Sequence, residues 1–154
     1  MNVEYGELQA HFEGTVEDVT HAFLNFLKTA HPAFPLAAKL MYKPDLMELS
    51  SLLEGVIEYS SEGLILLRTD FTADEATLTI LLGIYVGSKI GVLTENTISV
   101  NTIANISRKA SKTILNQIKS MIDDGYVTRV GKGEYQIKNL GIKKMEAILR
   151  NEVT

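Results

Sequence analysis

Residues 99–137 carry the pattern that most constrains the fold of this 154-residue chain. Apolar residues at helical spacing predict a short helix over 100–106 and a second helix over 110–124, with only Ser107-Arg108-Lys109 between them. Gly125 follows, a residue free to take the left-handed conformation that ends a helix. Two alternating runs then flank Gly131-Lys132-Gly133, which predicts a β-hairpin with a three-residue loop. We therefore expect two helices joined by a tight turn and followed directly by a hairpin.

The flanking segments extend this pattern on both sides. Thr72 or Asp74 caps a predicted helix over 73–89, and its middle, Leu78–Val86, is apolar almost all round. A helix of that kind is usually buried on more than one side, so we expect it to pack against the first part of the chain, a second copy, or both. A very short strand is predicted around Ile98, and a last helix over 140–151.

The first part of the chain predicts a small α+β unit. Thr15 is the expected N-cap of its main helix, with Asp18 three residues on as a loose capping box. The predicted elements are a strand over 5–13, a helix from 16 to 30, a short helix over 36–41, a helix leading from Pro44-Asp45 to Gly55, and a hairpin of 56–59 and 64–67 around a four-residue loop. The whole chain is thus predicted to be α+β, with an acidic domain over 1–72 and a second domain over 73–154.

Charge divides the chain at the same place. Residues 1–72 hold 4 Lys+Arg and 11 Asp+Glu, a net charge of −7, whereas residues 73–154 hold 11 and 8, a net charge of +3. Residues 101–120 contain four basic residues and no acidic one. A positive segment attracts phosphate, and this electrostatic attraction supplies most non-specific affinity for DNA. A charged run is also the ordinary composition of a solvated helix face, so the order of elements has to decide between the two.

The second part resembles the winged helix-turn-helix domains of small bacterial and archaeal transcription regulators. The resemblance covers about half of the chain and is carried by Ser99-Val100-Asn101-Thr102-Ile103-Ala104, Ser111-Lys112-Thr113-Ile114, Ile118, Met121, Asp123-Asp124-Gly125-Tyr126-Val127 and the Gly131-Lys132-Gly133 tip. The chain departs from the family by using Ile and Met where Leu is usual, which conserves volume. The resemblance implies a regulator that binds duplex DNA, with the second helix of the motif in the major groove and the hairpin, or wing, on the backbone.

This fold implies specific contacts to DNA. Asn116 is the best candidate for pairing with adenine, and Lys112 can reach a guanine or a phosphate. Arg108, Lys109 and Lys119 are expected on phosphates, which position the protein without specifying sequence. Arg129 and Lys132 on the wing are expected at the backbone or an adjacent minor groove. The complete predicted set is Arg108, Lys109, Ser111, Lys112, Asn116, Lys119, Arg129 and Lys132.

Other classes of function find little support in the sequence. There is no Cys, and His11, His21 and His31 fall on different predicted elements, so we expect no metal site and no cofactor. No set of nucleophile, base and orienting group is visible, so we expect no enzyme. The chain shows no signal peptide and no apolar run long enough for a membrane span, which predicts a cytoplasmic protein.

Assembly and partners remain open at this point. The regulator is expected to be a homodimer, because winged-helix readers commonly pair on two half-sites, with the Leu78–Val86 helix and the C-terminal helix as candidate interfaces. The acidity of the chain favours an alternative, a winged-helix module that binds protein and not DNA. An accessory factor associated with RNA or a polymerase is a third, weaker possibility. The sequence names no operator, effector or regulated process.

Overall fold

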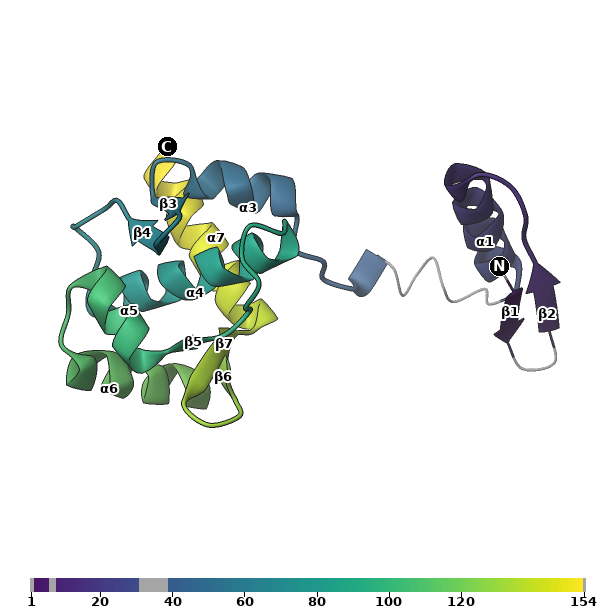
Figure 1. The fold of residues 1–154 in the computed structure, drawn as a ribbon. Coiled ribbons are helices and arrows are strands. Elements are labelled where there is room, and N and C mark those ends of the chain that lie inside the picture. Colours follow the sequence, from purple (N-terminus) through teal and green to yellow (C-terminus); the bar gives the residue numbers. More distant parts are fainter. Residues whose placement is uncertain (1, 6–7, 31–38, 154) are drawn as a thin grey trace. The chain divides into compact units, whose positions relative to one another are not determined.

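The computed structural model describes residues 2–5, 8–30 and 39–153 and shows a mixed α+β protein, as predicted (Figure 1). The chain divides into two compact units, residues 1–43 and residues 44–154. Within the described residues, no helix combines the length and apolarity that a bilayer span requires.

The first unit is a hairpin with one helix. Strands β1 (Asn2–Tyr5) and β2 (Leu8–His11) pair antiparallel, with Asn2 opposite His11. The sequence predicted one strand over 5–13, so its first strand was missed, and the predicted strand proves to be the second of a pair. The Phe12 ring meets the rings of Phe23 and Phe26 edge-on, at centroid distances of 6.3 and 5.9 Å.

Helix α1 (Val16–Ala30) has the predicted bounds and the predicted cap. The Thr15 hydroxyl accepts from the Asp18 amide at 3.1 Å, and the Asp18 carboxylate accepts from the Thr15 amide at 3.4 Å. His31, Pro32, Phe34 and Pro35, together with residues 36–38 of the short predicted helix, lie outside the described residues.

Helix α4 (Ala73–Lys89) is the centre of the second unit. Its predicted bounds are confirmed, and Thr72 and Glu75 form a reciprocal capping box. The helix is buried on nearly all sides, as predicted, with Leu78, Ile80 and Leu82 exposing 1% or less of their surface. Its coverage comes from the rest of the unit: it contacts α3, α5, α6, α7, β3, β4 and β7.

A hairpin packs closely on α4 at two glycines of that helix, Gly83 and Gly87. Strands β3 (Ile57–Ser60) and β4 (Gly63–Leu66) are joined by two residues, and not by the four-residue loop that was predicted, because Ser60 and Gly63 still pair. A methyl group on Gly83 would lie 2.5 Å from Leu64 Cδ1 and 2.7 Å from Ile57 Cδ1, so both side chains would have to shift to admit it. The Tyr59 hydroxyl donates to the Gly83 carbonyl at 2.7 Å.

This packing moves the domain boundary. The sequence placed the division at 72/73, where the charge changes sign, whereas the compact units divide between Lys43 and Pro44. Helix α3 (Leu46–Leu53), capped by Asp45, packs on α4 and α7, the β3–β4 hairpin packs on α4 and α5, and both belong to the second unit. Much of the acidic segment is therefore part of the same folded unit as the basic one.

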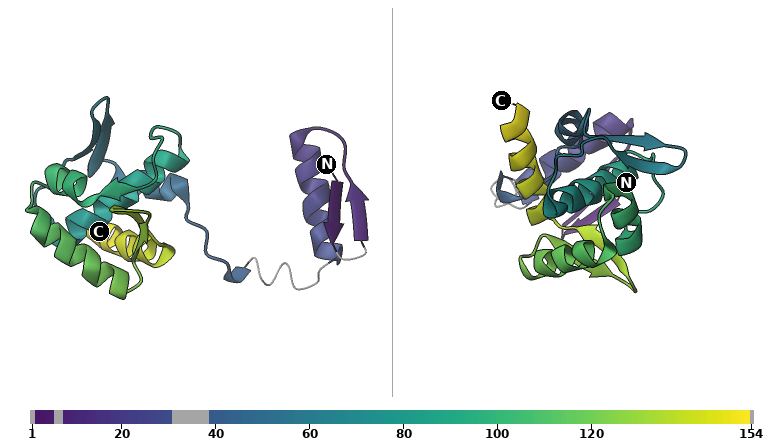
Figure 2. Two further views of the ribbon diagram at one scale, coloured as in Figure 1. Left: turned by 60° about the horizontal axis from the view of Figure 1, so that its bottom comes forward. Right: turned by 90° about the vertical axis from the view of Figure 1, so that its left-hand side faces the viewer.

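The remaining elements follow the predicted order. They are β5 (Ile98–Ser99), α5 (Val100–Ser107), α6 (Ser111–Asp123), β6 (Val127–Val130), β7 (Glu134–Ile137) and α7 (Asn139–Val153). The three strands form an antiparallel sheet in the order β5-β7-β6. Helices α5 and α6 pack on α4 and on each other. This is the order of elements that the sequence predicted, with the β3–β4 hairpin and α6 on opposite sides of α4 (Figure 2).

Both surfaces that the sequence offered for a homodimer are largely used inside this unit. The Leu78–Val86 stretch is core, with Val86 only 1% exposed. On α7, Ile142 and Met145 expose 1% and 0% of their surface, because this face packs on α3 and α4. Neither helix therefore presents its apolar face to a second copy.

Candidate nucleic-acid interface

Helix α6 separates an apolar face from a polar one. Ile114, Ile118 and Met121 are buried, with exposed fractions of 0%, 0% and 4%. Ile122, the next residue after Met121, is 37% exposed. Ser111, Lys112, Asn116 and Lys119 are exposed, as a recognition surface requires. The helix has 13 residues and is about 20 Å long at roughly 1.5 Å per residue, a rod that fits the major groove.

Thr113 lies on the same surface but was not among the predicted contact residues. Its side chain is exposed, and it lies three residues before Asn116, which places the two on one helix face. The three-residue spacing between Thr113 and Asn116 in a predicted helix was enough to predict its position.

The N-terminus of α6 has no capping side chain. Ala110 stands at the N-cap position and makes no side-chain hydrogen bond, and the first turn holds no acidic residue. In contrast, Asp45, Thr72 and Ser99 cap α3, α4 and α5 with their side-chain oxygens. The first amides of a helix, with the positive end of its dipole, form a ready site for phosphate. The first amides of α6 are thus left without a side-chain acceptor, a feature that was not predicted from the sequence.

The turn before α6 holds an unusual residue. Arg108 takes a left-handed conformation, with φ 58° and ψ 34°, and no other described residue besides glycine has a positive φ. L-residues rarely adopt this conformation because the Cβ crowds the backbone. The turn is tied by the Lys109 amide to the Ala104 carbonyl at 3.2 Å and by the Ser111 hydroxyl to Asn101 Oδ1 at 3.3 Å.

Arg108 is exposed at the turn, whereas Lys109 is only half exposed. Both line a cleft of about 370 Å³ together with Arg68 and Phe71. The Arg68 guanidinium lies 4.2 Å from the centre of the Phe71 ring and pairs with Asp70, which lowers the pKa of that carboxyl. Arg68 is therefore held by its neighbours, and Arg108 is the more accessible cation at this site.

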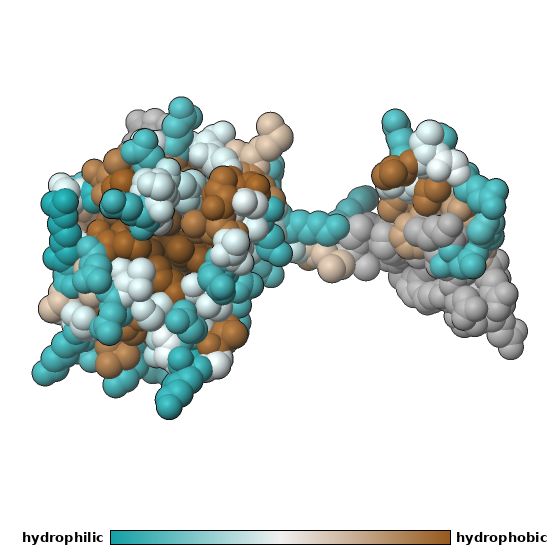
Figure 3. Space-filling model, in the orientation of Figure 1, coloured by the Kyte–Doolittle hydropathy of each residue, from teal (hydrophilic) through white to brown (hydrophobic). Residues whose placement is uncertain are grey.

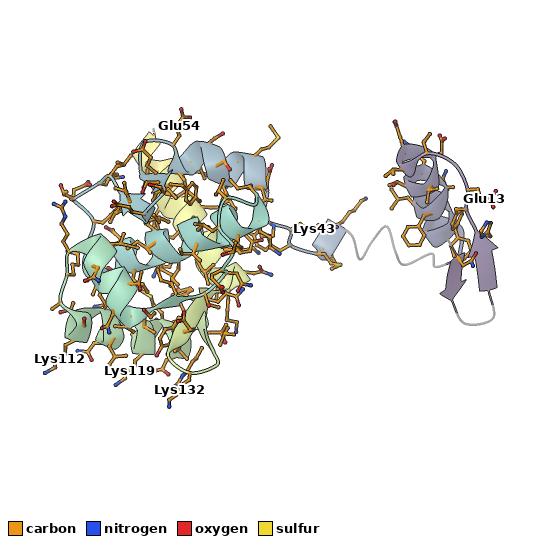
Figure 4. The ribbon with its side chains drawn as sticks, viewed as in Figure 1. Glu13, Lys43, Glu54, Lys112, Lys119 and Lys132 are labelled. Carbon is orange, nitrogen blue, oxygen red and sulfur yellow. The ribbon has the colours of Figure 1, made fainter. Side chains whose placement is uncertain are left out.

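The wing has the predicted geometry. Val130 pairs with Glu134, and Gly131 and Gly133 turn the chain with φ of 66° and 75°. Lys132 is exposed at the tip and Arg129 on β6. In Figure 4 the side chains of Lys112, Lys119 and Lys132 project from the same edge of the unit, and Glu54 lies at the opposite end.

The basic residues of this edge are available to a ligand. In the part of the chain that the structure describes, none of the six Lys and Arg side chains over 108–132 forms an ion pair. This segment carries 6 basic and 2 acidic residues, a net charge of +4, whereas residues 45–75 carry 1 and 8, a net charge of −7. One folded unit thus holds a cationic edge over 108–132 and, opposite that edge, an acidic end formed by helix α3 with Glu48 and Glu54 (Figures 1 and 4).

Histidine positions offer no competing site among the described residues. His11 Nε2 lies 2.8 Å from Glu13 Oε1, and its other ring nitrogen contacts Asn2. No group of three or more His, Asp or Glu side chains in this part of the chain is arranged to hold a metal ion.

Comparison of the chain with protein-family models, with curated proteins and with solved structures finds no significant match.

Proposed function

We propose that this chain is a sequence-specific, duplex-DNA-binding transcriptional regulator that inserts α6 into the major groove and places its wing on the backbone. The supporting observation is the cationic edge: Lys112 is exposed in the first turn of α6, at its uncapped N-terminus, Lys119 and Lys132 are exposed farther along the same edge (Figure 4), and none of the three forms an ion pair among the described residues. Phosphate contacts of this kind supply affinity and register. Asn116, exposed on the same helix, is the proposed reader of an adenine edge.

The proposal includes a cytoplasmic homodimer that binds two half-sites. Since the apolar faces of α4 and α7 are covered within the unit, the dimer contact has to use another surface. A sedimentation measurement on the full chain, with and without duplex, tests this part separately.

A salt titration of duplex binding tests the main proposal. We expect the full chain to bind random duplex DNA, with an affinity that falls linearly on a log–log plot as salt rises. Lys112→Ala and Lys132→Ala should each weaken binding and reduce the slope by about one unit. Fluorescence anisotropy of a labelled duplex between 50 and 200 mM salt measures both quantities.

Lys138→Ala is the matched control. This lysine is exposed directly after β7, at the end of the strand away from the wing turn, and its removal should leave the slope unchanged. If all three variants lower the slope equally, the binding is a non-specific response to net charge. If the full chain binds no duplex even at low salt, the alternative of a protein-binding winged helix, favoured by the acidic end, replaces the proposal.

A further inference from the structure

A cavity of about 610 Å³ opens on the second unit between the β3–β4 hairpin and helix α5. Its size is within the range of roughly 300–1,000 Å³ that is usual for small-molecule sites. Five apolar side chains contribute to its lining, namely Leu64, Ile84, Leu93, Ile98 and Ile106. Figure 3 shows apolar surface gathered on this face of the unit.

The charged residues that line this cavity are all acidic. Glu62, Glu95 and Glu134 come from the β3–β4 turn, the segment after α4 and strand β7, and no Lys, Arg or His lines the cavity. Within the described residues, none of the three carboxylates forms an ion pair. Arg108 lines a neighbouring cleft of about 280 Å³ that shares Glu62 and Asn105 with this cavity. An apolar lining with three carboxylates and no cation of its own favours a ligand that is apolar in its body and positively charged.

We propose that this cavity binds an organic cation with an apolar body, and that its occupant controls the DNA-reading elements. Thr102, Asn105 and Ile106 of α5 line the cavity, and α5 leads directly into the turn before α6. Glu134 lines it next to the wing turn. A ligand here contacts α5 and β7, the elements that adjoin α6 and the wing turn along the chain, so it shifts DNA affinity if it binds the two states unequally. This second step rests on the proposed function.

Two ions of equal shape and opposite charge test the site itself. Isothermal titration of the full chain with tetraphenylphosphonium, and with the smaller benzyltrimethylammonium, should show one saturable site for at least one of the two cations. Tetraphenylborate, the anionic match of the first, should bind at least about tenfold more weakly, because the rim carries negative charge. Equal binding of the two tetraphenyl ions, or no saturable binding of either cation, overturns the proposal.

Substitutions locate the site. Glu95→Gln and Glu134→Gln keep side-chain size and should each raise the Kd for the bound cation about two- to fivefold, the effect expected of a partly exposed charge pair. Glu58→Gln, on the same hairpin but outside the cavity, should leave the Kd unchanged. Thr97→Phe should fill the cavity and raise the Kd more than tenfold. Thermal unfolding of each variant shows whether the fold is kept, and a folded Thr97→Phe variant that binds normally overturns the proposed location.

The effect on DNA is measured separately, by anisotropy of a labelled duplex with and without saturating cation. A change in duplex Kd of about threefold or more, absent in Thr97→Phe, supports control of the reading elements. An unchanged Kd in a chain that binds both ligands overturns that control while the cavity stands. A chain that binds the cation but no duplex overturns the proposed function alone.

Discussion

The left-handed residue at the turn before α6 gives a prediction in which stability and binding move in opposite directions. Arg108 has φ 58° and ψ 34°, a conformation that costs an L-residue roughly 1–2 kcal/mol. Glycine has no such cost, but it loses about 0.5–1 kcal/mol more backbone entropy on folding. Arg108→Gly should therefore raise the free energy of unfolding by about 0.5–1 kcal/mol.

The same substitution should weaken DNA binding. Arg108 is exposed and forms no ion pair among the described residues, so under the proposed function its charge is free to contact a phosphate. Removing one phosphate contact lowers the slope of log K against log salt by about 0.9 for duplex DNA. The variant is thus expected to be the more stable protein and the poorer binder.

Arg108→Ala separates the two effects. It removes the same charge but keeps a Cβ in the left-handed conformation, so it should bind DNA like Arg108→Gly and be less stable than it by about 1 kcal/mol. Urea unfolding and anisotropy between 50 and 200 mM salt measure the two quantities. If the Gly variant is no more stable than the Ala variant, the turn is not left-handed at this residue. If both keep the wild-type slope, Arg108 touches no phosphate.

Two further predictions concern the packing and the capping of α4. In Gly83→Ala the new methyl group would lie 2.5 Å from Leu64 Cδ1. The cost of overpacking should outweigh a gain of about 1 kcal/mol in helix propensity, so the free energy of unfolding measured in urea should fall by about 1 kcal/mol. A more stable variant would contradict the close packing. The hydrogen bond from the Thr72 hydroxyl lowers the pKa of Asp74 below its ordinary 3.8, so its contribution to stability is present above that pH and is lost as the pH falls through the folded pKa. Asp74→Asn should flatten the acid limb of a plot of urea midpoint against pH, and an unchanged limb would show that another carboxylate controls it.

Local signals in the sequence predicted most of the second unit. Thr72 and Glu75 stand three residues apart and form the capping box that starts α4, and Gly125 ends α6 with a φ of 83°. Each of these signals acts over a single turn of chain, where the chemistry of one or two residues decides the conformation. The wing was also predicted from a local signal, because a Gly-x-Gly loop between two alternating runs strongly favours a β-hairpin.

Contacts between segments that are distant in the sequence could not be predicted from local signals. The domain boundary was placed by the change in charge, but charge is a property of the surface, while the boundary depends on what packs together. Gly83 and Gly87 leave room on α4 for Leu64, Ile57 and Tyr59 of the hairpin. The local sequence of the helix or of the hairpin does not indicate that the two pack together. For the same reason, Leu78–Val86 and the apolar face of α7 were offered as dimer surfaces when they are the core of one unit.

The corrected boundary changes how the acidity of the chain bears on DNA binding. The acidic end, helix α3 with Glu48 and Glu54, lies on the far side of α4 from α6 (Figures 1 and 4), and a helix with its side chains is about 10–12 Å across. The Debye length is about 8–10 Å at 0.1–0.15 M salt, so phosphates in contact with Lys112 and Lys132 are largely screened from the acidic end. At 0.01 M salt the screening length reaches about 30 Å, and the acidic end then repels the same phosphates. Under the proposed function, a net charge below zero therefore does not oppose duplex binding near physiological salt. It limits the gain in affinity at low salt and favours the orientation in which the cationic edge faces the duplex.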